Sequence, residues 1–172
     1  MEEGNAMKQR VILGVFVLLA AGIFSCTNPD STKFSSAAAR GGLTEVELGR
    51  LAVQRGSNPA VKSFGQRMIE DHSRANDELK SIAAKKSIAL PPDINSDQKA
   101  TMDKLSKLSG AEFDKEYMSD MVKDHEADAK EFENQANMGP DADIKAFAAK
   151  TLPMIKRHLQ MARDVANQVA AK

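Results

Sequence analysis

Residues 61–82 read VKSFGQRMIEDHSRANDELKSI, and the spacing within this stretch predicts the fold of the chain. Apolar side chains and one histidine recur every three or four residues, while charged residues occupy the positions between them. The members of this stripe are Val61, Phe64, Met68, His72, Ala75, Leu79 and Ile82. Asn58 can cap such a helix and Pro59 fits its first turn, so we expect an amphipathic helix over 59–87.

The composition indicates that helices dominate the rest of the chain. Among 172 residues there is no Trp, one Tyr and seven Phe, whereas Ala, Lys, Leu, Asp and Glu are abundant. Helix formers are therefore plentiful, and the aromatic and β-branched residues that favour strands are scarce. The 24 Lys and Arg residues balance the 24 Asp and Glu residues without a basic stripe, which argues against a nucleic-acid binder. We expect a single all-α domain.

The same periodicity predicts three more long helices and one short helix. The short connections at Gly56 and at 138–140 make antiparallel hairpins of the first two and of the last two long helices. The connection from residue 87 to residue 109 is long enough to return along the length of a bundle. We therefore predict a ferritin-like four-helix bundle, with a long crossover that carries a short extra helix between the second and third long helices. The expected ranges are 37–56 and 59–87 for the first two long helices, 96–108 for the short helix, a start at a capping box over 109–112 for the third, and 140–171 for the last.

One pentapeptide recurs along these helices. MIEDH at 68–72 is followed by MVKDH at 121–125 and by a looser copy at 154–158, so every histidine of the chain follows a methionine by four residues. Counting about 1.5 Å per residue from the ends of the predicted bundle puts the three histidines, and Glu47 of the first helix, at nearly one depth. All four lie on the predicted apolar stripes, and side chains from facing helices at one depth are how bundles build internal sites.

We therefore predict a metal site with Glu47, His72, His125 and His158 as ligands, and copper, zinc, iron or manganese as the ion. The alternative is a polar network in which the histidines only hydrogen-bond to neighbours and Glu47 pairs with one of them. Asp71 and Asp124 are turned by about 100° from the adjacent histidines, so they fit salt-bridge or supporting roles better than ligation.

The methionines of the repeat allow two interpretations. Met68, Met121 and Met154 each lie one helical turn before a histidine, where a thioether could act as a soft ligand and favour copper. Methionine is also a common filler of hydrophobic cores. The sequence favours the core role.

Signatures of catalysis are missing. Dinuclear iron sites in bundles use Glu-x-x-His, yet the positions three before each histidine are Ile69, Val122 and Ile155. No serine is placed for a Ser-His-Asp triad, and no pair of inward carboxylates fits glycoside hydrolysis. We predict no catalytic residue and expect a protein that is not an enzyme, with a mononuclear oxidase as a further alternative.

The N-terminal stretch predicts export. Lys8 and Arg10 precede an uncharged run over 11–25, which is too short to span a bilayer and matches a secretory signal. The run ends Ile23-Phe24-Ser25-Cys26, which resembles the lipobox of bacterial lipoproteins. We expect a signal peptide over 1–26 with Cys26 lipidated, a flexible tether over 27–36 and a bundle domain over 37–172. The alternative is an incidental Cys26 and cleavage elsewhere; as the only cysteine, Cys26 forms no internal disulfide.

Several blocks in order along residues 36–170 carry a family resemblance. They are EVELG at 45–49 with Leu51-Ala52, VKSF at 61–64, MIEDH at 68–72, FDKEY at 113–117, MVKDH at 121–125, and Leu152-Pro153 with His158-Leu159. The chain resembles the bacterial family called domain of unknown function 4142. The resemblance implies a ferritin-like bundle and an exported location, and it implies no reaction and no catalytic residues.

These features predict a non-catalytic envelope protein that faces the periplasm and is held to a membrane through its lipid anchor. The outer membrane is preferred to the inner one, because no aspartate follows Cys26. In this interpretation the Glu/His cluster binds a metal ion. The alternative is a structural or partner-binding protein, in a stress-related role, whose histidines form a polar network. Protein partners and a homo-oligomeric state are left open.

Overall fold

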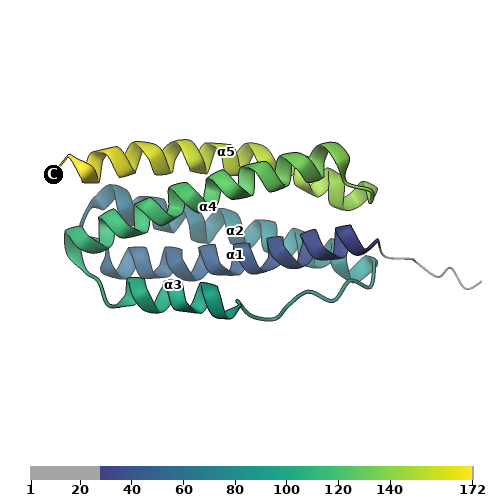
Figure 1. Cartoon of the computed structure of the whole chain (residues 1–172), viewed down its shortest axis with the longest axis horizontal. Coiled ribbons are helices and arrows are strands. Elements are labelled where there is room, and N and C mark those ends of the chain that lie inside the picture. The colour runs from purple at the N-terminus through teal and green to yellow at the C-terminus, as the bar shows by residue number, and fades with distance from the viewer. Residues whose placement is uncertain (1–27, 172) are drawn as a thin grey trace, which may run out of the picture.

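The computed structural model of the chain describes residues 28–171. The predicted signal peptide over 1–26 and the lipidation site Cys26 lie outside the described residues. Every element within the described range is a helix, which confirms the all-α prediction. The helices are α1 (Pro29–Arg55), α2 (Pro59–Lys85), α3 (Ser96–Ser106), α4 (Gly110–Met138) and α5 (Ala142–Ala170) (Figure 1). None of these five helices combines the length and the hydropathy that crossing a bilayer requires.

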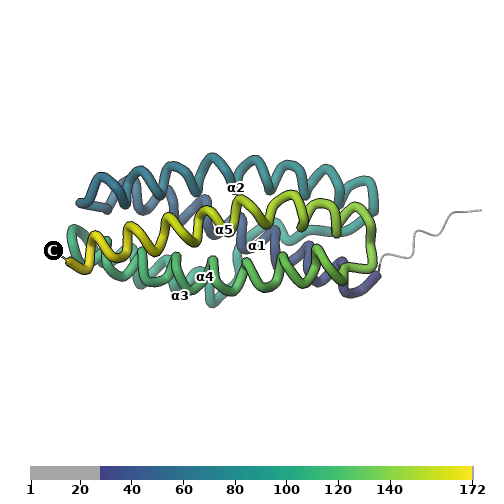
Figure 2. The backbone as a smooth tube through the Cα atoms, turned by 90° about the horizontal axis from the view of Figure 1, so that it is seen from above, coloured from purple at the N-terminus to yellow at the C-terminus, as the bar shows by residue number. Residues whose placement is uncertain are grey.

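The four long helices lie side by side, and α3 lies along their flank next to α1 (Figures 1 and 2). The pairs α1 with α2 and α4 with α5 are antiparallel hairpins with short loops. The connection from α2 to α4 returns along the length of the molecule and carries α3, so α2 and α4 run in the same direction (Figure 1). This topology brings the middles of α2, α4 and α5 to one level.

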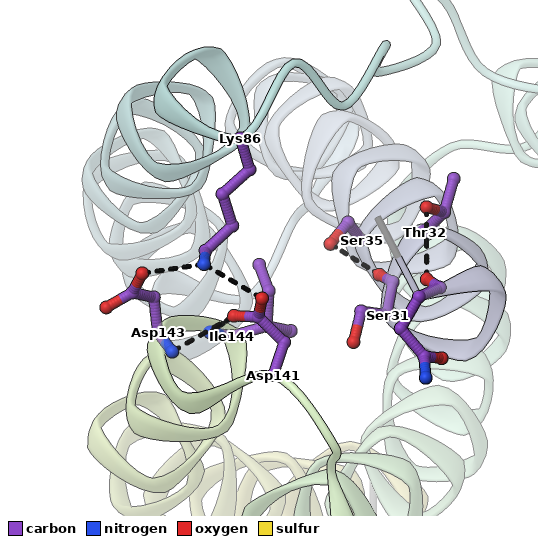
Figure 3. Close-up of polar contacts among 8 residues, drawn as sticks. Ser31, Thr32, Ser35, Lys86, Asp141, Asp143 and Ile144 are labelled. Atoms are coloured by element: carbon purple, nitrogen blue, oxygen red, sulfur yellow. Dashed lines mark hydrogen bonds and ion pairs between the residues drawn. The ribbon is translucent and has the colours of Figure 1, made fainter. Parts of the chain in front are cut away.

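Helix α1 begins well before the predicted residue 37. Asn28 caps it by accepting a hydrogen bond from the backbone N–H of Asp30, and Pro29 occupies the first turn. The predicted flexible tether is therefore wrong for residues 28–36. Phe34 is buried and packs edge-on against Phe132 of α4, with ring centroids 5.0 Å apart. Two of the hydroxyls that suggested a linker are bonded locally, since Thr32 Oγ1 donates to the carbonyl oxygen of Asn28 at 3.3 Å. Ser35 Oγ donates to the carbonyl oxygen of Ser31 at 2.7 Å (Figure 3).

Ionic and polar contacts tie the two hairpins together at both ends of the molecule. At one end, Lys86 after α2 contacts Asp141 at 2.8 Å and Asp143 at 2.7 Å, at the start of α5 (Figure 3). At the other end, the carboxylate of Asp114 on α4 accepts hydrogen bonds from the backbone N–H groups of Ser57 and Asn58, between α1 and α2. Contacts at both ends fix the lengthwise register of the hairpins, and with it the relative height of side chains in the middle.

The helix caps differ in one respect from the sequence prediction. Ser109 is the N-cap residue of α4, but within the described chain its side chain makes no capping hydrogen bond. The capping box forms instead at α3, where the Asn95 side chain accepts from the N–H of Gln98 and the Gln98 side chain accepts from the N–H of Asn95.

The hydrophobic core consists of two clusters along the bundle. The first includes Phe64 and Met68 of α2, Tyr117 and Met121 of α4, and Val165 of α5. The second is built on different members: Phe34, Ala39, Leu79, Ala83, Ile88, Phe132, Ile144, Phe147, Ala148 and Ile155. In α2, α4 and α5 alike, the histidine lies between the residues that each helix contributes to the two clusters. The histidines therefore form a polar layer between two apolar ones.

Candidate metal centre

The structure brings together the three predicted histidines, His72 of α2, His125 of α4 and His158 of α5. Their exposed fractions are 5%, 0% and 1%. The ring centroids lie 5.8 Å apart for His72 and His125, 5.3 Å for His72 and His158, and 5.5 Å for His125 and His158. Each imidazole offers one nitrogen within 4.8 Å of the other two. Three nitrogens bound to one tetrahedral zinc ion lie about 3.3 Å apart, so small side-chain adjustments of up to about 1.5 Å would complete such a site.

Asp71 determines which nitrogen of His158 carries the proton. Its Oδ2 lies 2.9 Å from Nε2 of His158, and its carboxylate also contacts the guanidinium groups of Arg74 and Arg67. Burial raises the pKa of Asp71, but the hydrogen bonds from His158 and Arg74 outweigh it and hold this pKa below its ordinary value. An ionised Asp71 accepts a hydrogen bond from the Nε2–H group of His158, which leaves the lone pair of Nδ1 free.

A backbone carbonyl determines which nitrogen of His125 carries the proton. Its Nδ1 lies 2.9 Å from the carbonyl oxygen of Met121, one helical turn earlier. A carbonyl only accepts, so Nδ1 is the protonated nitrogen and Nε2 carries the lone pair. This bond involves the backbone of Met121, so it does not depend on the side chain at that position.

One nitrogen of each histidine is buried without a hydrogen-bond partner among residues 28–171. These atoms are Nε2 of His72, Nε2 of His125 and Nδ1 of His158. Unsatisfied buried polar groups are costly, so three in one place need an explanation. Burial lowers the pKa of His72 to about 3 and of His158 to about 4, and it lowers that of His125 as well. All three rings are neutral at neutral pH, which is the form that binds a metal ion.

The prediction of Glu47 as the fourth ligand is wrong, because its side chain points away from the histidines. Glu47 is half exposed, with Oε1 3.7 Å from Nε of Arg50 on the outer side of α1. The buried glutamate of this helix is Glu45, whose Oε1 lies 3.9 Å from Nδ1 of His125. That nitrogen already donates to Met121, so Glu45 lies behind the ring and not beside the free nitrogen. Glu45 therefore adjoins the histidine cluster without completing its ligand set.

The error came from the choice of apolar stripe on α1. Leu43, Glu47 and Leu51 share a helical face, but Leu43 and Glu47 border a pocket beside the connection that carries α3. The inward face is marked instead by small residues. A Cβ at Gly49 would lie 2.6 Å from the carbonyl oxygen of Gly65, so α1 and α2 touch there, and Glu45 is one turn from Gly49. In the sequence, Gly49 was the available signal that Glu45, one turn earlier, lies on the inward face of the helix.

Acidic groups around Glu45 have unusual proton affinities. Burial, reinforced by the charge of Asp124, raises the pKa of Glu45 to about 8. Burial and the charge of Glu45 raise the pKa of Asp128 to about 7. The hydroxyl of Tyr117 is also fully buried, has no partner within residues 28–171, and has its pKa raised well above 10.0 by burial. The side of the histidine layer nearest α1 therefore carries acidic groups that hold their protons more tightly than free carboxyl groups do.

The methionines of the repeat lie among core residues. Met68 and Met121 are fully buried members of the first apolar cluster, and Met154 packs against the second. Their side chains thus contribute to the layers on either side of the histidines.

Comparison with known proteins supports the fold and identifies the family. A crystal structure of a DUF305 fragment from Deinococcus radiodurans is similar to this chain, with a TM-score of 0.73 and 10% sequence identity. The similarity covers 82% of this chain and 97% of the fragment, and at this identity it concerns the fold alone. No curated protein matches the chain. Residues 25–165 match the family described as domain of unknown function DUF4142, and the chain belongs to that family.

Proposed function

We propose that this protein binds a transition-metal ion through His72, His125 and His158. The observation that carries the proposal is the set of three buried imidazole nitrogens, one per histidine, that lack partners within the described chain. A bound ion would satisfy all three at once. Asp71 and the Met121 carbonyl hold two of the rings in the tautomer that binding needs, an arrangement that raises ligand basicity in metalloproteins.

The donor set narrows the choice of ion. Three neutral imidazoles suit zinc, copper and iron, whereas manganese prefers oxygen ligands. The thioethers of Met68 and Met121 lie in the apolar cluster, so a soft copper site that depends on sulfur is not favoured. Three protein ligands leave a fourth position of a tetrahedral ion for water or another small ligand. Zinc is the first candidate.

We further propose an exported protein of ferritin-like architecture, anchored to a membrane through Cys26 and acting in the cell envelope without catalysis. The charged start, the uncharged run over 11–25 and the lipobox-like end support export and lipidation. Labelling of the expressed protein with a radioactive fatty acid tests the anchor. Incorporation into the native chain and none into Cys26→Ser would support it, and equal labelling of both would contradict it.

Metal analysis tests the site. The full chain, stripped with a chelator and then dialysed against zinc, should retain one ion per molecule. His72→Gln and His125→Gln keep polar bulk but remove the ligating nitrogen, so both should lose stoichiometric binding while remaining helical by circular dichroism. Met68→Leu and Met121→Leu are matched controls on the same helices and should bind as the native chain does.

The opposite result would identify a polar network. If the native chain takes up no zinc, copper or iron, and gains no thermal stability from any of them, the histidines only contact one another. The function would then lie in a structural or partner-binding role.

A further inference from the structure

A pocket of about 280 Å³ opens on the face of the molecule between α1, α3 and α4. Four carboxylates line it: Glu45 of α1, Asp97 of α3, and Asp124 and Asp128 of α4. No lysine or arginine of residues 28–171 is among the lining side chains. Three other surface pockets each include at least one lysine, namely Lys33, Lys99 and Lys85. This pocket is therefore distinguished by its charge.

Glu45 gives the pocket a second distinguishing feature. Its side chain is 3% exposed, and its Oε2 has no hydrogen-bond partner in the described part of the chain. The same carboxyl group approaches His125 at 3.9 Å. A buried acidic oxygen without a partner therefore lies at the inner wall of this pocket and against His125 of the histidine cluster.

A second, smaller cavity lies deeper in the bundle. It measures about 30 Å³, enough for one or two water molecules, and His72, Asn76 and Thr151 are among its lining residues. Asp128, Gly41 and Ala37 line both this inner cavity and the outer pocket. The two spaces thus share a wall, and the carboxylate of Asp128 belongs to both of them.

Gly41 of α1 belongs to that shared wall. A Cβ placed at Gly41 would meet nothing within 4 Å, whereas one at the adjacent Gly42 would overlap the amide of Asn76. Close packing of α1 on its neighbours therefore does not require a glycine at residue 41. The position that a side chain of residue 41 would occupy is open space, beside both the outer pocket and the inner cavity.

We propose that divalent cations reach the histidine centre through this acidic passage, from Asp97 and Asp124 at the mouth, past Glu45 and Asp128, to His72. The proposal rests on the metal-binding function proposed above and adds the route. Carboxylates of one sign concentrate cations at a pocket mouth and speed their capture, and this effect weakens as ionic strength rises.

The test measures rate and extent separately, with Co²⁺ as the probe because its visible absorption reports histidine coordination. The metal-free full chain is mixed with Co²⁺ by stopped flow at low and at high salt, and the final stoichiometry is recorded. Gly41→Leu fills the wall of the passage, and Gly41→Ala is its control. Asp97→Asn with Asp124→Asn removes charge at the mouth, and Asp103→Asn with Glu133→Gln removes the same charge elsewhere on α3 and α4.

Gly41→Leu should slow uptake about tenfold or more, and the mouth variant several-fold at low salt only, with the final stoichiometry unchanged in both. Both controls should load at the native rate. Native uptake that depends on His72 and His125, together with unchanged rates in both test variants, would overturn the passage and leave the centre standing. Absence of Co²⁺ uptake by the native chain would overturn the centre and the passage together.

Discussion

Oδ2 of Asp71 on α2 lies 2.9 Å from Nε2 of His158 on α5, so one helix determines the protonation of a histidine on another. Asp71→Asn should weaken zinc binding roughly 10- to 100-fold, because a neutral amide holds the His158 tautomer poorly and lowers its basicity. Isothermal titration would measure the change. Asp77→Asn, an exposed acid on the same helix, is the control. Equal affinity of Asp71→Asn and the native chain would show that the contact serves stability alone.

The buried histidines make the stability of the metal-free protein depend on pH. Burial lowers the pKa of His72 to about 3 and that of His158 to about 4, from a value of 6.5 for an unperturbed histidine. Between these values the unfolded chain binds protons that the folded histidines do not, so the contribution of the histidines to stability falls as the pH drops below 6.5. Glu45 and Asp128, with pKa values raised to about 8 and about 7, act in the opposite direction and offset part of this loss. Each histidine adds a slope of up to about 1.4 kcal/mol per pH unit.

Urea unfolding at several pH values between about 4 and about 7 would measure this slope. His72→Leu removes one titrating group and leaves His125 and His158 in place. The stability of this variant should therefore depend on pH less steeply than that of the native chain. An unchanged slope in the variant would mean that His72 is protonated inside the folded protein.

The start of α1 should carry stability. Phe34→Ala removes a buried ring that packs against Phe132, and it should lower the free energy of unfolding by about 3 kcal/mol. Lys33→Ala, at the exposed neighbouring position, should change it by less than about 0.5 kcal/mol. Chemical denaturation would measure the free energy of unfolding of the two variants and of the native chain. Equal stability would restore the interpretation of residues 28–36 as a tether.

Two glycines of α1 should respond to alanine in opposite directions. A Cβ at Gly41 meets nothing within 4 Å, so Gly41→Ala should stabilise the protein by about 0.5 kcal/mol or more through reduced freedom of the unfolded chain. A Cβ at Gly49 would lie 2.6 Å from the carbonyl oxygen of Gly65, so Gly49→Ala should force the helices apart at a cost of about 2 kcal/mol. Thermal denaturation would show a higher melting temperature for Gly41→Ala and a lower one for Gly49→Ala. A shift of both melting temperatures in the same direction would contradict the close contact of Gly49 with Gly65.

Sequence periodicity was sufficient to predict α2 to α5 and the meeting of the three histidines. Each histidine lies on an apolar stripe of its helix, and short hairpin loops leave little freedom in relative height. The tautomers of His125 and His158 were not accessible in this way. They depend on contacts of 2.9 Å to Met121 and Asp71. Sequence spacing does not give the orientation of the imidazole rings that these contacts need.

The first helix was harder to predict because it contacts two surfaces. Its inner side packs on α2 through glycines, and its outer side faces the connection with α3, so both sides carry apolar residues. A hydrophobic stripe then does not say which side is inward, and Glu47 was chosen over Glu45. The start of the helix was missed although Asn28-Pro29 repeats the capping pair Asn58-Pro59, because the serines suggested a linker.

The histidine layer draws its ligands from both hairpins, with His72 on one and His125 and His158 on the other. A bound ion would therefore act as a cross-link between two halves of the chain, closing a loop across the whole α3 connection. Such a link lowers the entropy of the unfolded chain most when the closed loop is long. The metal-loaded protein should then resist separation of the hairpins more strongly than the metal-free protein, in which the core clusters and the contacts at the two ends hold the hairpins together.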